Sequence, residues 1–137
     1  MLPESVRTVI ASGPLAHVTT LAPSGAPHVT LAWIGLDGDA VVFGTLADQP
    51  KLRNIRRDPR IAISLHTANT NAYGLAEYAV LHGRATVVPG GAAALLQRLA
   101  RIYLGPNVVF PPMPNPPAGF ITRLTVDRIT GVGPWNG

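Results

Sequence analysis

The chain has 137 residues, of which 47% are apolar and 13% charged, so it can bury a core and global disorder is excluded. It contains no cysteine, which excludes disulfides, thiolate metal sites and a cysteine nucleophile. The formal net charge of +4 favours anionic partners such as nucleic acid, an acidic membrane surface or a phosphorylated small molecule.

The first part of the chain predicts one short helix followed by three strands. Pro3 suits a first helical turn and Gly13-Pro14 ends the helix, so the helix is expected over residues 3–12. Runs rich in β-branched residues, separated by turns at 22–27 and 35–39, predict strands over residues 15–21, 28–34 and 40–45. Because these strands are consecutive and closely connected, they are expected to pair as an antiparallel meander.

The rest of the chain predicts two more helices and three more strands. The helices are expected over 50–58, with Asp48 as N-cap, and over 92–104. The strands are expected over 60–66, 78–88 and 120–126. Gly83 marks a bulge or a close approach of backbone in the second of these. Residues 67–74 and the proline-rich 111–117 are expected to be loops.

About six antiparallel strands with a few short helices predict a mainly β fold, a β-barrel, as a single domain over residues 1–137. The regular alternation of strand and helix that builds a Rossmann sheet is missing, and so is a G-x-G-x-x-G motif. The four histidines lie on different predicted strands without metal-ligand spacing, so no metal site is expected.

The segment after the third predicted strand suggests an anion site. A strand end supplies the Thr45 hydroxyl, and the start of the next helix supplies backbone N–H groups and the positive end of the dipole. Lys51, the only lysine in the chain, lies in the first turn, where a cation is normally disfavoured. Its position makes sense if an anion lies in front of it.

Four arginines, Arg53, Arg56, Arg57 and Arg60, accompany this lysine. Helical spacing places Lys51, Asn54 and Asp58 on one side of the predicted helix and spreads the arginines around its axis. Lys51 and one or two arginines are expected to face the anion. The others are expected to pair with acidic side chains, Asp48, Asp58 or Glu77. Asp127 and Glu77 are both interpreted as ion-pair partners. The alternative is a solvated basic helix face with no ligand.

Three stretches together resemble a known family. They are residues 16–33, the segment 51–60 (KLRNIRRDPR) and residues 81–85 (LHGRA). This pattern resembles the pyridoxamine 5'-phosphate oxidase-like split β-barrels, which share the FMN-binding-like fold, and in particular their actinobacterial branch that uses the deazaflavin coenzyme F420. A chain rich in Ala, Arg, Gly and Pro with one lysine fits that branch.

The resemblance implies a cofactor site at the interface of a homodimer. Thr45 and Lys51 would hold the cofactor phosphate, and Tyr78 and Ala79 would contact cofactor across the interface. Proteins of this branch often carry an arginine at the position of Gln49, and its absence leaves Arg53 or Arg56 as substitutes. The ring and ribityl chain would lie along Thr30, Leu31, Ala32, Phe43 and Gly44.

The function that follows is a flavoprotein-type oxidoreductase that transfers a hydride between F420 and an unsaturated small-molecule acceptor. The alternatives are an FMN-dependent enzyme of the same family and a non-catalytic cofactor or ligand carrier. A nucleic-acid binder ranks last because aromatic residues are scarce near the arginines. The sequence identifies no catalytic residue and no general acid, so protonation by water is expected.

The surroundings of the cofactor and the location of the protein give further expectations. Trp33 could lie near the cofactor ring, or it could belong to the core or a dimer interface. The loop at 106–117 is expected to border the substrate pocket. No membrane span is expected, since no run of about 18 apolar residues occurs. The N-terminus lacks the layout of a secretory signal, so a cytoplasmic protein is expected.

Overall fold

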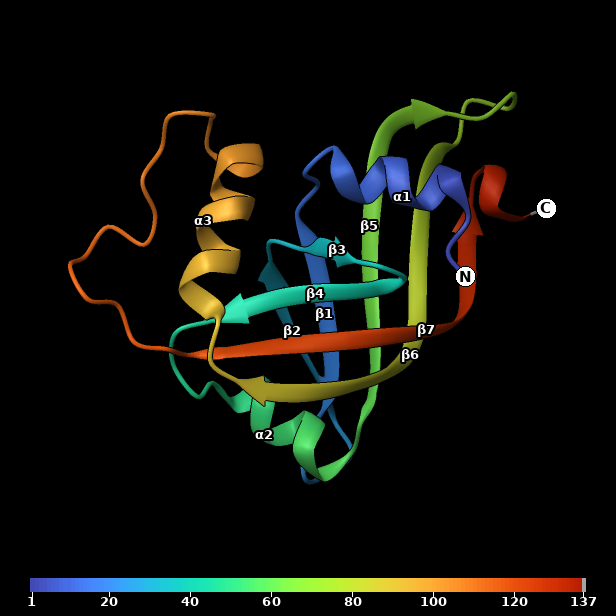
Figure 1. The fold of residues 1–137 in the computed structure, drawn as a ribbon. Helices are drawn as coiled ribbons and strands as arrows, with labels where there is room; N and C mark the ends of the chain where they lie inside the picture. Colours follow the sequence, from blue (N-terminus) through green and yellow to red (C-terminus); the bar gives the residue numbers. More distant parts are fainter. Residues whose placement is uncertain (137) are drawn as a thin grey trace.

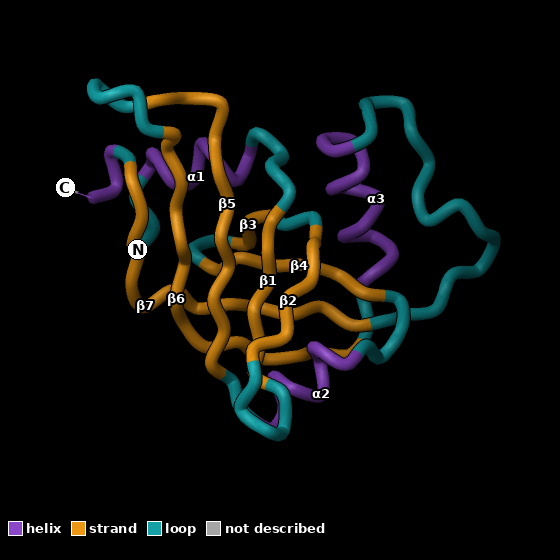
Figure 2. Tube along the Cα trace, turned by 180° about the vertical axis from the view of Figure 1, so that it is seen from behind, coloured by secondary structure: helices purple, strands orange, loops and turns teal. Residues whose placement is uncertain are grey.

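The computed structural model describes residues 1–136 and shows a strongly curled antiparallel sheet with helices at its two ends and along one side (Figures 1 and 2). The strands are β1 (Ala16–Leu21), β2 (Pro27–Ala32), β3 (Gly35–Asp37), β4 (Ala40–Thr45), β5 (Arg60–Thr70), β6 (Ala76–Pro89) and β7 (Phe120–Val132). The helices are α1 (Glu4–Ala11), α2 (Pro50–Arg57), α3 (Ala92–Tyr103) and the short 3-10 helix η1 (Pro134–Asn136).

The order of strands in the sheet is β2-β1-β5-β6-β7-β4-β3. Its first and last strands, β2 and β3, follow one another in the chain and are linked only by Trp33 and Ile34. The sheet must therefore curl until its two edges approach each other, which makes a split β-barrel. This confirms the predicted fold class, with seven strands in place of about six.

The long strands β6 and β7 turn the corner of this barrel together (Figure 1). Their register shifts between His82 and Gly83, which is the bulge predicted at this glycine. A Cβ at Gly83 would overlap the carbonyl oxygen of Thr125, so only glycine allows the two backbones to come this close. The bulge bends β6 and β7, so that β6 pairs with β5 on one side of the barrel and β7 pairs with β4 on the other.

The predicted meander of the first three strands is wrong. β1 and β2 pair, but β4 pairs with β7 and with the short strand β3, in a segment predicted as a turn. The reason lies in β4 itself, where Val41, Val42 and Phe43 are all buried. Val41 and Phe43 pack in the barrel core and Val42 packs beneath α3, so β4 is covered on both faces. Such a strand suits the interior of the sheet, where it lies between β7 and β3, and not a place beyond β2.

The main core fills the barrel, and α1 and α2 close its two ends (Figure 1). Val18, Phe43, Ile63, Leu81 and Leu124 are the buried strand residues at its centre, each at most 1% exposed. A second, smaller cluster lies between the sheet and α3, built from Val42, Leu95 and Leu99, with Trp33 and Tyr103 packed against it. Within residues 1–136, no helix has the length and apolar character needed to cross a membrane.

Candidate functional site

A cavity of about 580 Å³ opens where the barrel is split. It is lined by β2, by the end of β4 and the loop that follows, by the start of α2 and by single residues from α3 and the long loop after it. The lining residues are Leu15, Thr30, Leu31, Ala32, Trp33, Gly44, Thr45, Leu46, Ala47, Gln49, Lys51, Leu96 and Phe110. Lys51 is the only charged residue among them.

Two other hollows of about 460 and 550 Å³ lie elsewhere on the surface. Neither offers a buried cation among its lining residues. In the smaller one, Arg98 is exposed and Arg123 forms an ion pair with Asp37. Of these three hollows in the described part of the chain, the cavity at the split is the one that combines an apolar wall with a buried charge, as ligand sites usually do.

Lys51 is only 5% exposed, and its ε-amine is the only side-chain amino group in the sequence. Its Nζ donates to Thr30 Oγ1 at 3.2 Å and lies 5.2 Å from the centroid of the Phe43 ring. Burial lowers the pKa of this amine from 10.5. The ion pairs found within residues 1–136 do not include Lys51. A buried cation without a carboxylate is costly until an anion joins it.

The amphipathic pattern of α2 explains why the Lys51 side chain is buried and not directed to solvent. Lys51, Leu52, Asn54 and Ile55 form its buried face, as helical spacing dictates. Asn54 donates to Thr20 Oγ1 of β1 at 3.1 Å, which anchors the middle of the helix against the barrel. The prediction that Lys51 and Asn54 share one side of this helix is confirmed.

Thr45 ends β4 at the same cavity, and its side chain is buried without a partner. The residue is 7% exposed, and Oγ1 makes no hydrogen bond. An unpaired buried hydroxyl costs about 1–3 kcal/mol, which a ligand oxygen would recover. The start of α2 also lacks a side-chain cap, because its N-cap is Gln49 and not Asp48 as predicted. Pro50 has no N–H and the Leu52 N–H donates to the Gln49 carbonyl, so an anion at this helix start would meet the Lys51 N–H and the positive end of the helix dipole.

The predicted arginines do not line the cavity. Arg53 donates to the backbone carbonyl of Asp48 at 2.7 Å, and Arg56 donates to the carboxylate of Asp48 at 2.8 Å. This ion pair holds the carboxylate of Asp48 away from the helix start, and it confirms the predicted pairing of Asp48. Neither arginine takes the role left open by Gln49, because both side chains are held on the Asp48 side of α2.

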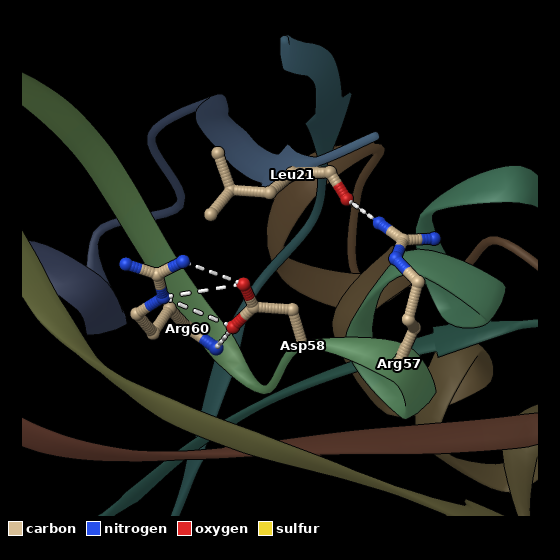
Figure 3. A network of polar contacts seen from close by, with 4 residues as sticks. All are labelled: Leu21, Arg57, Asp58 and Arg60. Carbon is tan, nitrogen blue, oxygen red and sulfur yellow. Dashed lines mark hydrogen bonds and ion pairs between the residues drawn. The ribbon is translucent and has the colours of Figure 1, made fainter. Parts of the chain in front are cut away.

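The two remaining arginines of the cluster are also occupied (Figure 3). Arg57 donates to the carbonyl of Leu21, and Arg60 pairs with Asp58 at 2.7 Å. The hydrogen bond from the Arg60 side chain is the main cause that lowers the pKa of Asp58 to about 2. Lys51 is thus the one member of the basic cluster that faces the cavity. Glu77 and Asp127 were each expected to form an ion pair with a basic side chain. This expectation is wrong, since the ion pairs within residues 1–136 include neither residue.

An aromatic wall stands opposite the polar end. Trp33 stacks on Tyr103 with ring centroids 5.4 Å apart, and Phe110 tilts against Trp33 at 5.2 Å. The Tyr103 hydroxyl accepts from the Ile34 N–H at 3.1 Å and donates to the Pro14 carbonyl at 2.6 Å. These bonds fix the chain as it passes between the two edges of the barrel.

The long loop joins this wall through one glutamine. Gln97 of α3 donates to the Val108 carbonyl at 2.8 Å and accepts from the Phe110 N–H at 2.9 Å. Both backbone groups of the loop are therefore satisfied by one side chain, and Phe110 is held at the cavity. Phe110 is the lining residue that comes from the loop expected to border the substrate pocket, and the substrate role of this cavity stays a prediction.

The comparison with known proteins agrees with this geometry. A family model described as pyridoxamine 5'-phosphate oxidase matches residues 2–133. The chain belongs to this family. No curated protein matches the chain. A solved structure described as an F420 reductase is 25% identical, with a TM-score of 0.73, and the match covers 94% of this chain and 98% of that chain.

Two mycobacterial structures share the fold alone. A conserved hypothetical protein from Mycobacterium tuberculosis is 22% identical with a TM-score of 0.73, over 96% of this chain and 84% of that chain. A heme binding protein from Mycobacterium smegmatis is 23% identical with a TM-score of 0.66, over 97% of this chain and 55% of that chain. The pyridoxamine 5'-phosphate oxidase fold therefore occurs in proteins described both as a reductase and as a binding protein.

Six of the ten cofactor-binding residues predicted from the family resemblance line the cavity: Thr30, Leu31, Ala32, Gly44, Thr45 and Lys51. Tyr78 and Ala79 do not line it within one chain. Tyr78 is 42% exposed on the outer face of β6, whereas the Ala79 side chain is buried in the barrel. Phe43, also expected along the ring, is 1% exposed and points into the core beneath Lys51.

Sequence reasoning did not identify several residues that complete the site in this member of the family. Phe110 and Leu96 lie far from β2 in the chain, and no local pattern marks them as its neighbours. Leu15, Leu46 and Ala47 are small or apolar residues of ordinary composition. Their contribution is the shape of the wall, which only the folded chain creates.

Proposed function

We propose that the chain holds the phosphorylated tail of coenzyme F420 at Lys51 and transfers a hydride to an unsaturated small-molecule acceptor in the same cavity. One observation carries the proposal: a buried amine without a carboxylate lines the cavity together with a buried hydroxyl that has no partner. The likeness to the F420 reductase structure, which extends over nearly the whole of both chains, supports the choice of cofactor.

The residues present fit a phosphorylated ring cofactor. Lys51 supplies the cation, Thr45 supplies a free hydroxyl, and the start of α2 supplies the positive end of the helix dipole. At the other end, Trp33 and Phe110 offer flat apolar surface to a planar ring. The same features also fit FMN, which is the alternative cofactor.

When bound, such a cofactor supplies the hydride, and the protein supplies position and electrostatics. Lys51 neutralises the phosphate, and its bond to Thr30 Oγ1 keeps the amine in one place. The wall of Trp33 and Phe110 excludes water from the ring side of the cavity. The described lining residues include no Asp, Glu, His or Tyr, so water is the proton donor we propose.

We also propose that the active form is a homodimer. Seen from behind, β6, β5, β1 and β2 lie side by side with no helix in front of their middle part (Figure 2). Val29, Leu31 and Tyr78 are exposed on these strands at 58%, 54% and 42%, and Leu31 also lines the cavity. A second copy would cover this apolar surface next to the cavity, and its Tyr78 would approach the cofactor.

A binding role without turnover is the second candidate, and the absence of a general acid from the described lining favours it. It gains support from the heme binding protein that shares the fold. Titration of the purified protein with F420, FMN and haem, followed by absorbance, separates these hypotheses because the three have distinct visible spectra. Reduced F420 is then mixed with quinone and enone acceptors.

We expect saturable binding of F420 and oxidation of its reduced form by an acceptor. Tight binding with no turnover of any acceptor would establish the carrier role. Binding of haem alone, or of none of the three, would overturn the proposal.

A further inference from the structure

The small number of amino groups in this sequence makes the reactivity of Lys51 easy to measure. A protein prepared with these 137 residues has two amino groups, the α-amine of Met1 and the ε-amine of Lys51. The first belongs to a fully exposed residue at the chain terminus, while the second lines the cavity with 5% of its residue exposed. A reagent that reacts with amines can therefore label only two nitrogens, the exposed α-amine of Met1 and the buried ε-amine of Lys51.

We propose that Lys51 is a carbonyl-reactive amine, which in the cofactor-free protein condenses with planar aromatic aldehydes that enter the cavity. Its Nζ attacks the carbonyl carbon to give a carbinolamine. Loss of one water, made from the carbonyl oxygen and two protons of the amine, then leaves a C=N bond in place of the C=O bond. The step needs no oxidant or reductant, and it does not depend on the proposed hydride transfer.

The surroundings of the amine raise the share of its neutral, nucleophilic form. The lining of the cavity brings no carboxylate to hold the proton, and burial lowers the pKa of Lys51. The charged groups nearest in the chain are Arg53 and Asp48. Arg53 donates to the Asp48 carbonyl, and the Asp48 carboxylate accepts from Arg56. On β2, the titratable group closest along the strand is His28, whose Nδ1 is buried without a partner.

The walls select the kind of aldehyde. The aromatic residues Trp33 and Phe110 line a space of about 580 Å³, which exceeds the volume of a small aromatic molecule. A planar ring gains stacking and apolar contact there that an alkyl chain of similar reactivity does not. The Thr30 hydroxyl, 3.2 Å from Nζ, holds the amine at the same cavity.

The test compares the two amines within one molecule. The protein is treated at neutral pH with benzaldehyde and cyanoborohydride, which traps imines as stable benzyl groups, and peptide mass spectrometry gives the ratio of label on Lys51 to label on Met1. The same ratio in concentrated urea reports the unperturbed amines. Because a lowered pKa leaves a larger share of neutral amine at neutral pH, we expect the ratio to be higher in the folded protein than in urea.

If the ratio of label on Lys51 to label on Met1 in the folded protein is equal to or below the ratio in urea, the proposal is overturned. The variant Lys51→Arg keeps the cation but removes the nucleophile, so all label should move to Met1. Replacing benzaldehyde by propanal should lower the share of label on Lys51. Equal shares for the two aldehydes would overturn the role of the aromatic wall.

Protection by cofactor distinguishes this proposal from the proposed function. An anion at Lys51 stabilises its charged form and blocks the cavity, so saturating F420 or FMN should suppress labelling of Lys51 but not of Met1. Enhanced labelling that neither cofactor suppresses would leave the reactive amine intact and refute the phosphate site. Cofactor binding by a protein whose lysine gains no reactivity on folding would refute the reactive amine alone.

Discussion

Replacement of Lys51 by Met tests the phosphate site most directly. The substitution keeps a flexible side chain of similar length but removes the only charge that lines the cavity. The lost contact is a charge-assisted hydrogen bond in a site sheltered from water, since Lys51 is 5% exposed. Such bonds contribute about 2–3 kcal/mol. At 1.4 kcal/mol per factor of ten, the Kd for the cofactor should rise roughly 30- to 150-fold.

The stability of the ligand-free protein should not follow this loss. Lys51→Met gives up the bond to Thr30 Oγ1 and the contact with the Phe43 ring, but it also removes a desolvated cation without a carboxylate. Replacement of poorly compensated buried charge by an apolar group is commonly neutral or stabilising. The melting temperature should therefore stay level or rise while cofactor affinity falls.

The matched control is Arg53→Met on the same helix. It also removes one positive charge, but its guanidinium is exposed and bound to the Asp48 carbonyl. At physiological ionic strength the Debye length is about 8 Å, so its remaining influence is largely screened and Kd should change less than about threefold. The assay is an absorbance or fluorescence titration with F420, and with FMN in parallel. Equal losses in both variants, or no loss with Lys51→Met, would refute the reasoning.

Three further outcomes are expected. Thr45→Val should raise the cofactor Kd by about 3- to 10-fold, as expected for loss of one hydrogen bond, without lowering the melting temperature. Thr122→Val removes the other buried threonine hydroxyl without a partner, away from the cavity, so a similar loss of affinity there would contradict the assignment. Cofactor affinity should fall as pH rises through the lowered pKa of Lys51, because the anion binds the protonated amine, and titrations across pH should show the fall beginning below 10.5. Val29→Asp should convert a dimer to monomers in analytical ultracentrifugation, whereas Val109→Asp on the loop, where the residue is 78% exposed, should not; a monomeric parent protein would refute the proposed dimer.

The sequence by itself determined what depends on local periodicity. Apolar runs of strand length predicted a mainly β barrel, and the turn and helix punctuation placed α2 and α3 within a residue or two of their bounds. Helical spacing put Lys51 and Asn54 on one side of α2, and the structure buries that side. Even the bulge in β6 could be predicted, because Gly83 has no side chain to pack and lets a neighbouring backbone come close.

The tertiary structure decided what depends on partners far apart in the chain. β4 joins β7 and not β2, in an interior position of the sheet where the barrel core covers one of its apolar faces and α3 covers the other. Arg53 and Arg56 turn away from the cavity because Asp48 competes for them, a choice that charge counting cannot resolve. Phe110 reaches Trp33 only because Gln97 satisfies the backbone of a distant loop. The sequence gives the type of each side chain, but which side chains touch depends on how distant segments pack. The cavity is lined by residues from such distant segments, so only the tertiary structure defines it.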